Sequence, residues 1–466
     1  MEHRIEHDLI GDVEVPSDVY WGIHSLRAIE NYPITGKTIG TYPTLVTALA
    51  LTKHAAALAN AELGLLDREK ADAIISACEE LVAGKLHDQF VVDVIQGGAG
   101  TSTNMNANEV IANRGLELMG HTKGEYSHLH PINHVNMSQS TNDVYPTALR
   151  VATCFSIREL IVAMAELRHA FEVKAEEFRD ILKIGRTQLQ DAVPMTLGQE
   201  FMTYVVMLHE DELRLHEAIA LIREINLGAT AIGTGINTDM RYSKMAIDHL
   251  SRLSDLELEA APNLIEATQD CGAFVQLSGV LKRVACKLSK TCNDLRLLSS
   301  GPQAGLNEIN LPPRAAGSSI MPGKVNPVIP EVVNQIAFEV IGNDVTITMA
   351  AEGGQLQLNA FEPIIAHSLF KSVEHLTAGC RTLAVHCVAG ITANRELLAE
   401  RVRTSAGLAT ALNPFIGYEN ATRVAQEALR TGRGVAELVE EMGLMGREEL
   451  DAVLSPAVLT APRRAG

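Results

Sequence analysis

The feature that most constrains this chain is a set of long stretches in which apolar residues recur every three or four positions. One stretch begins at Pro194, a favourable first residue for a helix, and continues for about four heptads with a break at Asp211. Its apolar positions are Leu197, Phe201, Tyr204, Leu208, Leu215, Ala218, Ile222 and Ile225. This spacing predicts a long helix with a narrow apolar seam.

Four further stretches have the same period. One follows Pro262 and stops at Gly301-Pro302, and the others cover about 144–180, 327–352 and 361–390. Five long helices imply a bundle, and aromatic residues make up only 4% of the chain, which suits packed helices better than a sheet sandwich. Helices of this length exceed the needs of one domain core, so we expect their remaining faces to pack against other copies of the chain.

The pattern changes at both ends of the bundle. Before about residue 140 the segments are shorter and rich in Gly and Pro, with an edge strand expected near Ile5–Val15, and after about 394 short helices are expected around Gly417 and Gly443. We therefore predict a mainly α fold with three domains: a mixed N-terminal domain (1–140), a central helical bundle (141–394) and a small C-terminal helical domain (395–466).

Charge and composition exclude several classes of protein. The formal net charge of -18 disfavours nucleic acid and acidic membrane surfaces as partners. No charge-free apolar run of about 20 residues is found, and the first residues do not resemble a secretion signal. The seven cysteines have no Cys-x-x-Cys spacing, so neither a disulfide framework nor a zinc site is expected. A cytoplasmic location is the default expectation.

Two segments dense in hydroxyl and amide side chains each precede a helical stretch. The first is Gly97-Gly-Ala-Gly-Thr-Ser-Thr-Asn-Met-Asn-Ala-Asn108, followed by a helical run from Glu109; its glycines and hydroxyl groups could meet an anion near a helix N-terminus. The second is Asn133-His-Val-Asn-Met-Ser-Gln-Ser-Thr-Asn-Asp143, where Ser140, Thr141 and Asn142 could hold a carboxylate while Asp143 caps the helix. Helix capping alone is the more common explanation of the first segment, and it explains the second about as well as a binding site does.

Two more polar segments lie further along the chain. Gly185-Arg-Thr-Gln-Leu-Gln-Asp-Ala-Val-Pro194 reads as a polar turn that leads into the long helix. Gly317-Ser-Ser-Ile-Met-Pro-Gly-Lys-Val-Asn-Pro327 combines Gly, Pro, two serines and one lysine in a loop, which is typical of a functional segment. A loop serine first suggests nucleophilic acyl transfer, but neither serine lies in a Gly-x-Ser-x-Gly elbow, and spacing cannot say which histidine would be its base. The residues alone thus predict a site for a small anion and leave the role of serine open.

The Gly317–Pro327 segment resembles the signature of the aspartase/fumarase superfamily. The two hydroxyl-rich segments resemble its other active-site stretches, and Asn413–Tyr418 resembles its C-terminal domain, so the likeness covers nearly the whole chain. Arg4–Gly11, Tyr20–Asn31, Met137 and Val328–Glu331 are more similar to the aspartases than to the fumarases of this superfamily. Gln188 stands where fumarases usually have histidine, which also favours an aspartase.

The resemblance implies a homotetramer with a twenty-helix core, in which three subunits build each active site. It implies reversible deamination of L-aspartate to fumarate and ammonium by anti elimination through an aci-carboxylate, with Ser318 as the base. Thr101, Ser140, Thr141 and Ser319 would hold the β-carboxylate. Lys324 and Asn326 would hold the α-carboxylate, and Asn142 and Thr187 the amino group.

By the same resemblance, no cofactor and no active-site metal are required, although a divalent cation such as Mg²⁺ could activate the enzyme. Expected partners are L-aspartate, fumarate, ammonium and other copies of the chain. Two alternatives are a fumarate hydratase on the same fold and a non-catalytic helical structural protein. The role of Gln188 and the resting conformation of the 317–326 loop are not predicted.

Overall fold

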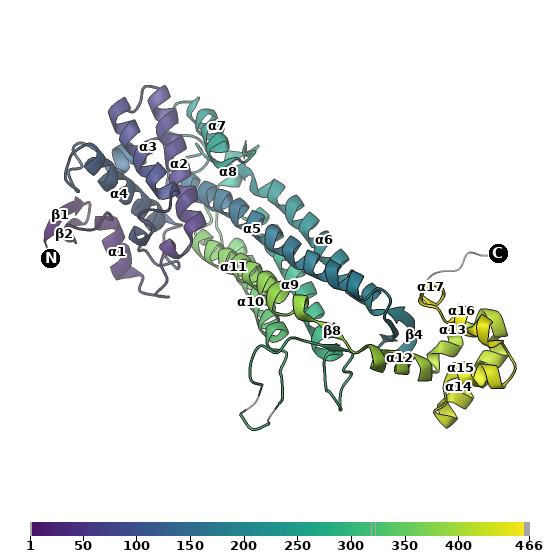
Figure 1. Ribbon diagram of the computed structural model, residues 1–466. Coiled ribbons are helices and arrows are strands. Elements are labelled where there is room, and N and C mark those ends of the chain that lie inside the picture. The colour runs from purple at the N-terminus through teal and green to yellow at the C-terminus, as the bar shows by residue number, and fades with distance from the viewer. Residues whose placement is uncertain (1, 318, 322, 461–466) are drawn as a thin grey trace. The chain divides into compact units, whose positions relative to one another are not determined.

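The computed structural model describes residues 2–317, 319–321 and 323–460, and they are mainly helical (Figure 1). The chain divides into two compact units, each built from three stretches of sequence. Unit 1 contains residues 1–161, 213–283 and 338–376, and unit 2 contains residues 162–212, 284–337 and 377–466. The prediction of a mainly α fold is confirmed. The division into domains 1–140, 141–394 and 395–466 stays a prediction.

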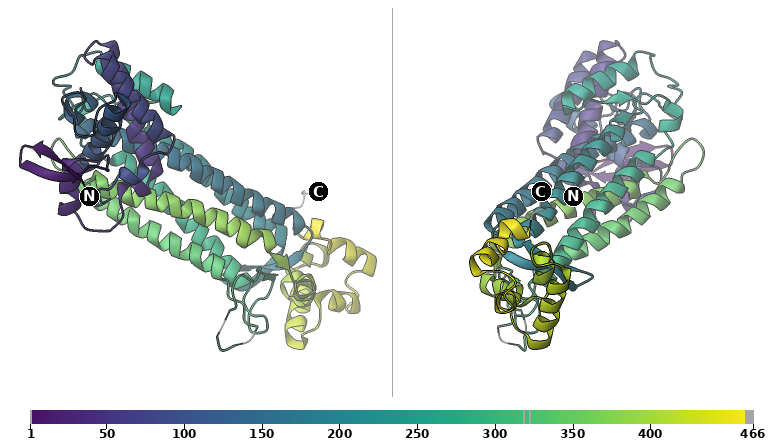
Figure 2. Two further views of the ribbon diagram at one scale, coloured as in Figure 1. Left: turned by 60° about the vertical axis from the view of Figure 1, so that its left-hand side comes forward. Right: turned by 90° about the vertical axis from the view of Figure 1, so that its right-hand side faces the viewer.

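Five long helices carry residues of both units. They are α5 (Thr141–Glu177), α6 (Leu197–Ile222), α9 (Gly272–Leu298), α10 (Val328–Glu352) and α11 (Glu362–His386). Within each unit these helices run side by side (Figures 1 and 2). Each coincides closely with one of the five periodic stretches, because a continuous apolar stripe stabilises a helix wherever the stripe can be buried.

The start of α6 differs from the prediction. Pro194 lies in strand β4 (Gln190–Thr196), opposite Ile184 of β3 (Leu182–Thr187), and the helix begins only at Leu197. The polar segment 185–194 is therefore a β-hairpin and not a simple turn. Asp211, which interrupts the apolar seam, is buried and lies 3.1 Å from the ammonium group of Lys287 on α9, so its charge is paired.

Unit 1 also contains shorter elements, which come before α5 or between α6 and α9 in the chain. They are β1 (His3–Asp8), β2 (Gly11–Pro16), α1 (Ile23–Asn31), η1 (Ile39–Thr41), α2 (Pro43–Glu62), α3 (Arg68–Val82), η2 (His87–Gln89), α4 (Thr101–Leu118), the π-helical turn η3 (Pro131–Val135), β5 (Glu224–Ile225), α7 (Tyr242–Ser254), β6 (Glu259–Ala260) and α8 (Leu264–Ala267). The edge strand expected near Ile5–Val15 is an antiparallel hairpin of β1 and β2. Helix α2 is rich in Ala and Leu, and most of its residues are buried, so it forms the centre of this part of the unit.

Unit 2 also contains short elements outside the long helices, most of them after residue 386. They are β3, β4, β7 (Ile309–Asn310), η4 (Val388–Gly390), β8 (Thr392–Ala393), α12 (Arg395–Thr404), α13 (Gly407–Ile416), α14 (Tyr418–Thr431), α15 (Val435–Glu441), α16 (Arg447–Val453) and α17 (Pro456–Leu459). Their apolar side chains form a cluster of their own around Leu412, Val424 and Val439. A second cluster of tilted and edge-on rings joins Phe171, Phe178 and Phe201. The unit therefore has a core of its own.

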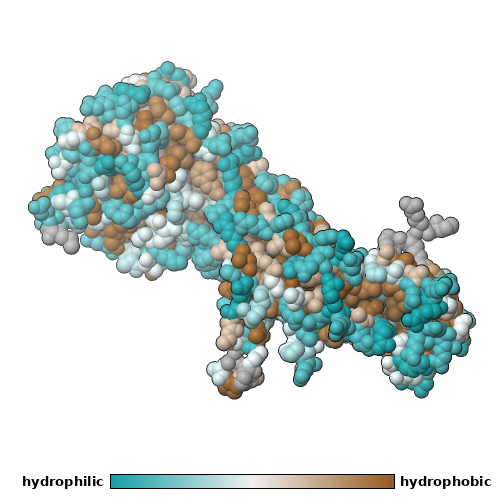
Figure 3. All heavy atoms as spheres, in the orientation of Figure 1, coloured by the Kyte–Doolittle hydropathy of each residue, from teal (hydrophilic) through white to brown (hydrophobic). Residues whose placement is uncertain are grey.

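Apolar side chains also lie on the outside of the long helices. Figure 3 shows apolar residues scattered over one face of the molecule. Those that are exposed on α5, α6, α10 and α11 include Val162, Val173, Met202, Val206, Leu213, Leu221, Phe338, Val345, Met349 and Val385. No described helix is long and apolar enough to cross a membrane.

The seven cysteines are all free thiols. Cys286 is exposed and the other six are buried. Burial raises the pKa of each buried thiol above its ordinary value, because a thiolate is poorly solvated inside the protein.

Candidate active site

In unit 1, the first hydroxyl-rich segment forms the tight entry to helix α4. The helix begins at Thr101 and not near Glu109, so Thr101–Asn104 form its first turn. Gly100 precedes it with φ +90°, and a β-carbon on Gly100 would lie 2.6 Å from the ring of Tyr145 on α5. Only glycine fits this close approach, which brings the backbone at the start of α4 onto the first turns of α5.

The second segment begins helix α5 with a reciprocal cap. The Ser140 hydroxyl oxygen accepts the Asn142 N–H at 3.2 Å, and the Asp143 carboxylate accepts the Ser140 N–H at 3.0 Å. Thr141 accepts a hydrogen bond at 3.1 Å from the side chain of Asn104 on α4. Two helix N-termini therefore lie next to each other, so the positive ends of both helix dipoles lie in one region.

A fully buried lysine underlies this pair of helix starts. The ammonium group of Lys53, on α2, donates to the side-chain oxygens of Asn104 at 2.6 Å, Asn136 at 2.9 Å and Gln139 at 2.7 Å. Burial lowers the pKa of Lys53 to about 7, because desolvation disfavours the charged form. All three ammonium protons have an acceptor. Asn104 in turn donates its side-chain amide to the Thr141 hydroxyl. The cation thus holds in place the amide groups behind the expected carboxylate site.

Asp143 is the second buried charge of this region. Its carboxylate accepts the backbone N–H groups of Gly228 at 3.1 Å and Thr230 at 2.8 Å in addition to that of Ser140. Burial nevertheless raises its pKa to about 7. The neighbouring Asn142 donates its side-chain amide to the carbonyl oxygen of Ala231 at 2.8 Å. Both side chains therefore tie the start of α5 to the 226–231 segment.

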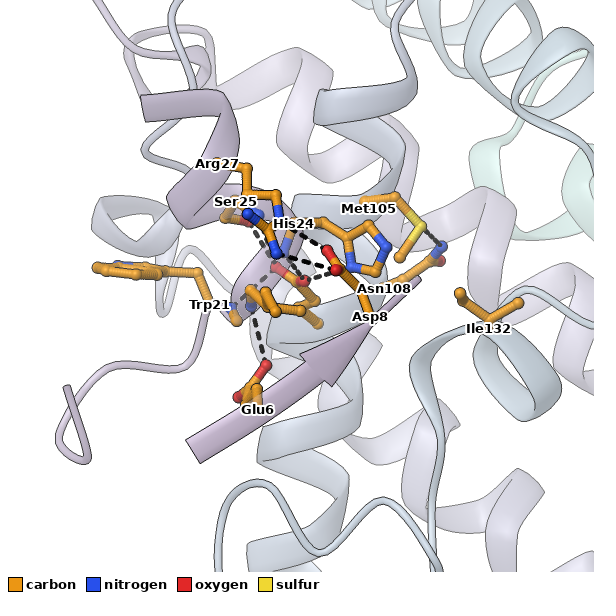
Figure 4. A network of polar contacts seen from close by, with 12 residues as sticks. Glu6, Asp8, Trp21, His24, Ser25, Arg27, Met105, Asn108 and Ile132 are labelled. Carbon is orange, nitrogen blue, oxygen red and sulfur yellow. Dashed lines mark hydrogen bonds and ion pairs between the residues drawn. The ribbon is translucent and has the colours of Figure 1, made fainter. Parts of the chain in front are cut away.

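Thr101 lines a hollow of about 330 Å³ in unit 1. The hollow is lined by Asp8, Leu9, Ile10, His24, Arg27, Thr101, Ser102 and Met105. Figure 4 shows Arg27 directed at Asp8, with the two bonds of this bidentate pair measuring 2.7 and 2.9 Å. Arg27 holds the pKa of Asp8 at about 2, so both groups are charged at neutral pH and their charges are mutually satisfied.

The buried carboxylate of Glu109, on α4, fixes the opposite wall of this hollow. It accepts the backbone N–H groups of Gly22, His24 and Ser25, and the Ser25 hydroxyl at 2.6 Å. His24 Nδ1 lies 3.1 Å from the same carboxylate, which raises the pKa of His24. The start of α1 is therefore clamped to α4 next to Thr101.

In unit 2, Thr187 lies at the end of β3, beside the tip of the β3–β4 hairpin. The two tip residues, Gln188 and Leu189, have φ values of 52° and 63°, a conformation that this pair adopts without any glycine. Thr187 and Gln188 are both exposed. The preceding strand is anchored by the buried Glu308 carboxylate, which lies 2.7 Å from Lys183 and 2.7 Å from Arg186. The hairpin tip thus projects from a firmly held base.

The 317–326 loop has a narrow neck. Asn326 donates its side-chain amide to the carbonyl oxygen of Gly317 at 2.7 Å, which joins the two limbs of the loop. Ser319 and Lys324 are exposed, and Asn326 is partly buried. Lys324 and Asn326 both line a hollow of about 780 Å³ next to the start of α10. Ser318, expected to be the base, lies outside the described residues.

The predicted site residues thus fall into two groups. Thr101, Ser140, Thr141 and Asn142 belong to unit 1, where the starts of α4 and α5 bring them to one region. Thr187, Ser319, Lys324 and Asn326 belong to unit 2, on the hairpin tip and on the loop. Their roles in substrate binding stay predictions.

Residue patterns did not reveal the buried charges behind the first group. Lys53 interacts with residues that lie 51, 83 and 86 positions away in sequence, so no local pattern contains them. One signal was available, because a lysine in the middle of the Ala- and Leu-rich helix α2 has no solvent-facing side on which to place its charge.

Comparison with known proteins identifies the family. A lyase family model matches residues 11–342, and a fumarase C C-terminus model matches residues 408–461. An aspartate ammonia-lyase of Pseudomonas aeruginosa is 59% identical over 461 residues, which cover 99% of this chain and 97% of that protein. A Brucella melitensis protein described as fumarate lyase:delta crystallin, in a crystal structure with bound cobalt, is 53% identical with a TM-score of 0.96, covering 99% of this chain and 100% of that one.

A class II fumarase of Schistosoma mansoni has the same fold at lower identity. It is 35% identical with a TM-score of 0.91, and the match covers 98% of both chains. The mainly helical fold and the predicted superfamily are thereby confirmed. From the full-length match of sequence and structure, we conclude that this chain belongs to the lyase family of the aspartase/fumarase superfamily.

Proposed function

We propose that this chain catalyses the reversible elimination of ammonium from L-aspartate to give fumarate. The observation that carries the proposal is the 59% identity, over 99% of the chain, to the Pseudomonas aeruginosa aspartate ammonia-lyase. The neighbouring N-termini of α4 and α5 support it, because their hydroxyl groups and positive dipole ends favour a carboxylate in a protein whose net charge of -18 would otherwise repel a dianion.

The proposed reaction begins with removal of a proton from the carbon next to the β-carboxylate. Ser318 is the proposed base, and the product of this step is an aci-carboxylate in which that group carries two negative charges. Thr101, Ser140, Thr141 and Ser319 would surround it. Donors that bind the doubly charged form more strongly than the ground state lower the barrier of this step. The carbon–nitrogen bond then breaks with anti geometry, and the amine leaves as ammonia.

The remaining residues are proposed to orient the substrate. Lys324 and Asn326 would bind the α-carboxylate, and Asn142 and Thr187 the amino group. Lys324 is exposed and Asn326 holds the neck of its loop, so the ammonium group can reach a ligand while the loop base stays fixed. Closure of the loop would exclude water and bring Ser318 to the substrate.

The positive charge of Lys53 lies behind the proposed carboxylate site and favours binding of an anion there. A buried cation next to Asn104 and Gln139 raises the electrostatic potential at the start of α5, where the β-carboxylate is proposed to bind. Asn104 connects this charge to Thr141 through a hydrogen bond of 3.1 Å. Lys53 would thus position and polarise the donors without touching the substrate.

Fumarate hydratase is the second candidate, and the 35% identity to a class II fumarase favours it as the alternative. The reaction passes through the same type of intermediate, with water in place of ammonia. Gln188 at the position where fumarases usually have histidine argues for ammonia. A non-catalytic structural protein is a third candidate.

We also propose that the chain acts as a homotetramer in the cytoplasm and needs no cofactor. The exposed apolar side chains of α5, α6 and α10 support association with other copies, because such surface is costly to leave in water. The free thiols suit a reducing compartment. The proton abstraction uses protein groups alone, and activation by a divalent cation such as Mg²⁺ stays a prediction.

The decisive test follows fumarate by its ultraviolet absorbance. Purified full-length chain is given L-aspartate in one cuvette and L-malate in a second. We expect absorbance to rise with L-aspartate alone; a rise with L-malate alone would make the chain a fumarase, and no change in either would favour the structural protein. The same assay on Ser318→Ala should show no turnover while the protein keeps its helical circular dichroism, and substantial residual activity would exclude Ser318 as the base.

A further inference from the structure

The loop that follows helix α4 brings together two histidines and a glutamate outside the proposed active site. His121, Glu125 and His128 each offer one ligand atom, and these atoms all lie within 4.8 Å of one another. His121 Nδ1 is 3.2 Å from the Glu125 carboxylate. The rings of His121 and His128 are stacked, with their centroids 3.8 Å apart and their planes 13° from parallel.

The backbone of this loop is held by its own hydrogen bonds. The N–H of His121 donates to the Leu116 carbonyl at 2.8 Å, that of Glu125 to Thr122 at 3.1 Å and that of His128 to Glu125 at 3.0 Å. The three side chains are therefore presented by a backbone of defined shape, which lowers the entropy cost of gathering them around a ligand.

Two side chains anchor the loop to the core of unit 1. The Tyr126 hydroxyl donates to the Glu6 carboxylate at 2.9 Å, and Leu129 is fully buried. His128 lies between these two anchors in sequence and is exposed, while Glu125 directly precedes the first. Side chains of the cluster can rotate in solvent while their backbone stays fixed.

The two cationic side chains beside the loop, Lys123 and Arg4, have partners outside the cluster. Lys123 donates to the Asp18 carbonyl at 2.7 Å and lies 4.0 Å above the Tyr20 ring. Arg4, which packs against Gly124, donates to the backbone carbonyls of Pro16, Val19 and Trp21. Besides its contact with His121, the Glu125 carboxylate accepts the Thr122 N–H at 3.2 Å, and neither of these two cations neutralises its charge.

We propose that His121, Glu125 and His128 form a binding site for a divalent transition-metal ion, above all Zn²⁺. Two imidazole nitrogens and one carboxylate oxygen are a ligand set that Zn²⁺, Co²⁺ and Ni²⁺ accept, whereas Mg²⁺ prefers oxygen ligands in an octahedron. A tetrahedral ion with bonds of about 2 Å holds its ligand atoms about 3.3 Å apart. The His121–Glu125 pair already has this spacing, and the other ligand atoms must close by at most about 1.5 Å. Rotation of exposed side chains allows this movement, and water would complete the coordination.

A bound ion would fasten the connection between α4 and η3. This connection leads directly into the polar segment 133–143, which contains the proposed substrate-binding residues Ser140 and Thr141. The ion has no part in the elimination reaction. Its expected effect is on the stability of unit 1.

The test is zinc binding to the full-length, untagged chain after removal of metals with a chelator. We expect calorimetry to find one equivalent of Zn²⁺ per chain that is missing from a His121→Ala/His128→Ala double variant, or bound there at least about tenfold more weakly. His169→Ala is the matched control, because His169 forms a similar pair with Glu172 at 3.4 Å and belongs to no described three-residue cluster. It should bind as the unchanged chain does.

Co²⁺ provides a second readout that does not depend on affinity. The unchanged chain and His169→Ala should develop the visible absorption of four- or five-coordinate Co²⁺, and zinc should raise their thermal midpoints. The double variant should show neither effect. Equal zinc stoichiometry and affinity in the double variant, or no zinc binding by the unchanged chain in the micromolar range, would overturn the proposal.

Discussion

The carbonyl oxygen of Lys324 faces the α-carbon of Gly317 so closely that a β-carbon on Gly317 would overlap it. The two limbs of the 317–326 loop therefore meet at a point where only glycine fits, and the Asn326–Gly317 hydrogen bond closes the same neck. The backbone contact fixes where the loop begins and ends.

Gly317→Ala should force these limbs apart and misplace Ser319 and Lys324. A displacement of about 1 Å at reacting groups can lower the rate about 100-fold, so we expect a loss of kcat of that order with an unchanged circular dichroism spectrum. Gly446→Ala is the control, because a β-carbon there meets no atom within 4 Å. Equal activity of the two variants would mean that the neck does not control the loop.

Lys324→Ala should act mainly on substrate binding. Removing the cation from a desolvated ion pair with the α-carboxylate costs roughly 2–5 kcal/mol, which corresponds to a KM higher by a factor of about 30 or more. Steady-state kinetics with L-aspartate measures the change. Lys85→Ala removes an exposed lysine that pairs with Glu80 at 3.4 Å and should leave KM as it is. An unchanged KM in Lys324→Ala would refute the contact.

Lys53→Met should destabilise unit 1 and impair the carboxylate site together. The change leaves the buried amide oxygens of Asn104 and Gln139 without their donor, at a cost of about 1–3 kcal/mol each. Urea unfolding should therefore show a loss of about 2–6 kcal/mol, accompanied by reduced turnover. Lys70→Met, which removes the partner of the exposed Asp67, should change stability by less than about 0.5 kcal/mol. If both variants unfold alike, the buried network is not essential.

Glu362→Gln should change how stability depends on pH. Burial raises the pKa of Glu362, at the start of α11, from 4.5 to about 8, and the charge of Arg150 opposes this shift only partly. Between these values the folded chain retains a proton that the unfolded chain releases. The stability contributed by this group is therefore complete below about pH 4.5 and is lost as the pH rises to about 8, at no more than about 1.4 kcal/mol per pH unit.

Glutamine resembles the protonated carboxyl group and does not ionise. Glu362→Gln therefore does not lose this stability as the pH rises. The stability of Glu362→Gln relative to the unchanged chain should thus increase steadily between pH 5 and pH 8, measured by urea unfolding at each pH. Glu448→Gln, at an exposed position, should follow the unchanged chain throughout. A constant difference between Glu362→Gln and the unchanged chain would show that Glu362 is already ionised in the fold.

The long helices could be predicted because their signal is local and repeated. Each apolar position of α6 or α9 supports the same helical periodicity. Misassigning one residue, such as Pro194, therefore shifts only the predicted start of the helix. The start of α4 was predicted too late because Thr101–Asn104 resemble a polar loop. The buried side chains of Thr103 and Asn104 make internal contacts that sequence does not reveal, such as that of Thr103 with Gln96.

The β3–β4 hairpin and the support of the site could not be predicted, for different reasons. Gln188 and Leu189 adopt positive φ without the glycine or asparagine that would signal such a turn. Lys53 and Glu109 act through partners distant in sequence, and only the fold brings these together. The site residues were proposed from family resemblance, and their substrate contacts stay predictions.

The distribution of buried thiols gives each unit its own reporter of local opening. Cys78, Cys154 and Cys271 lie in unit 1, while Cys292, Cys380 and Cys387 lie in unit 2. A buried thiol reacts with an alkylating reagent only when its surroundings open, so the labelling rate of each cysteine measures the free energy of that opening. Mass spectrometry of the labelled peptides would therefore reveal whether the two units open separately or together, without any engineered probe.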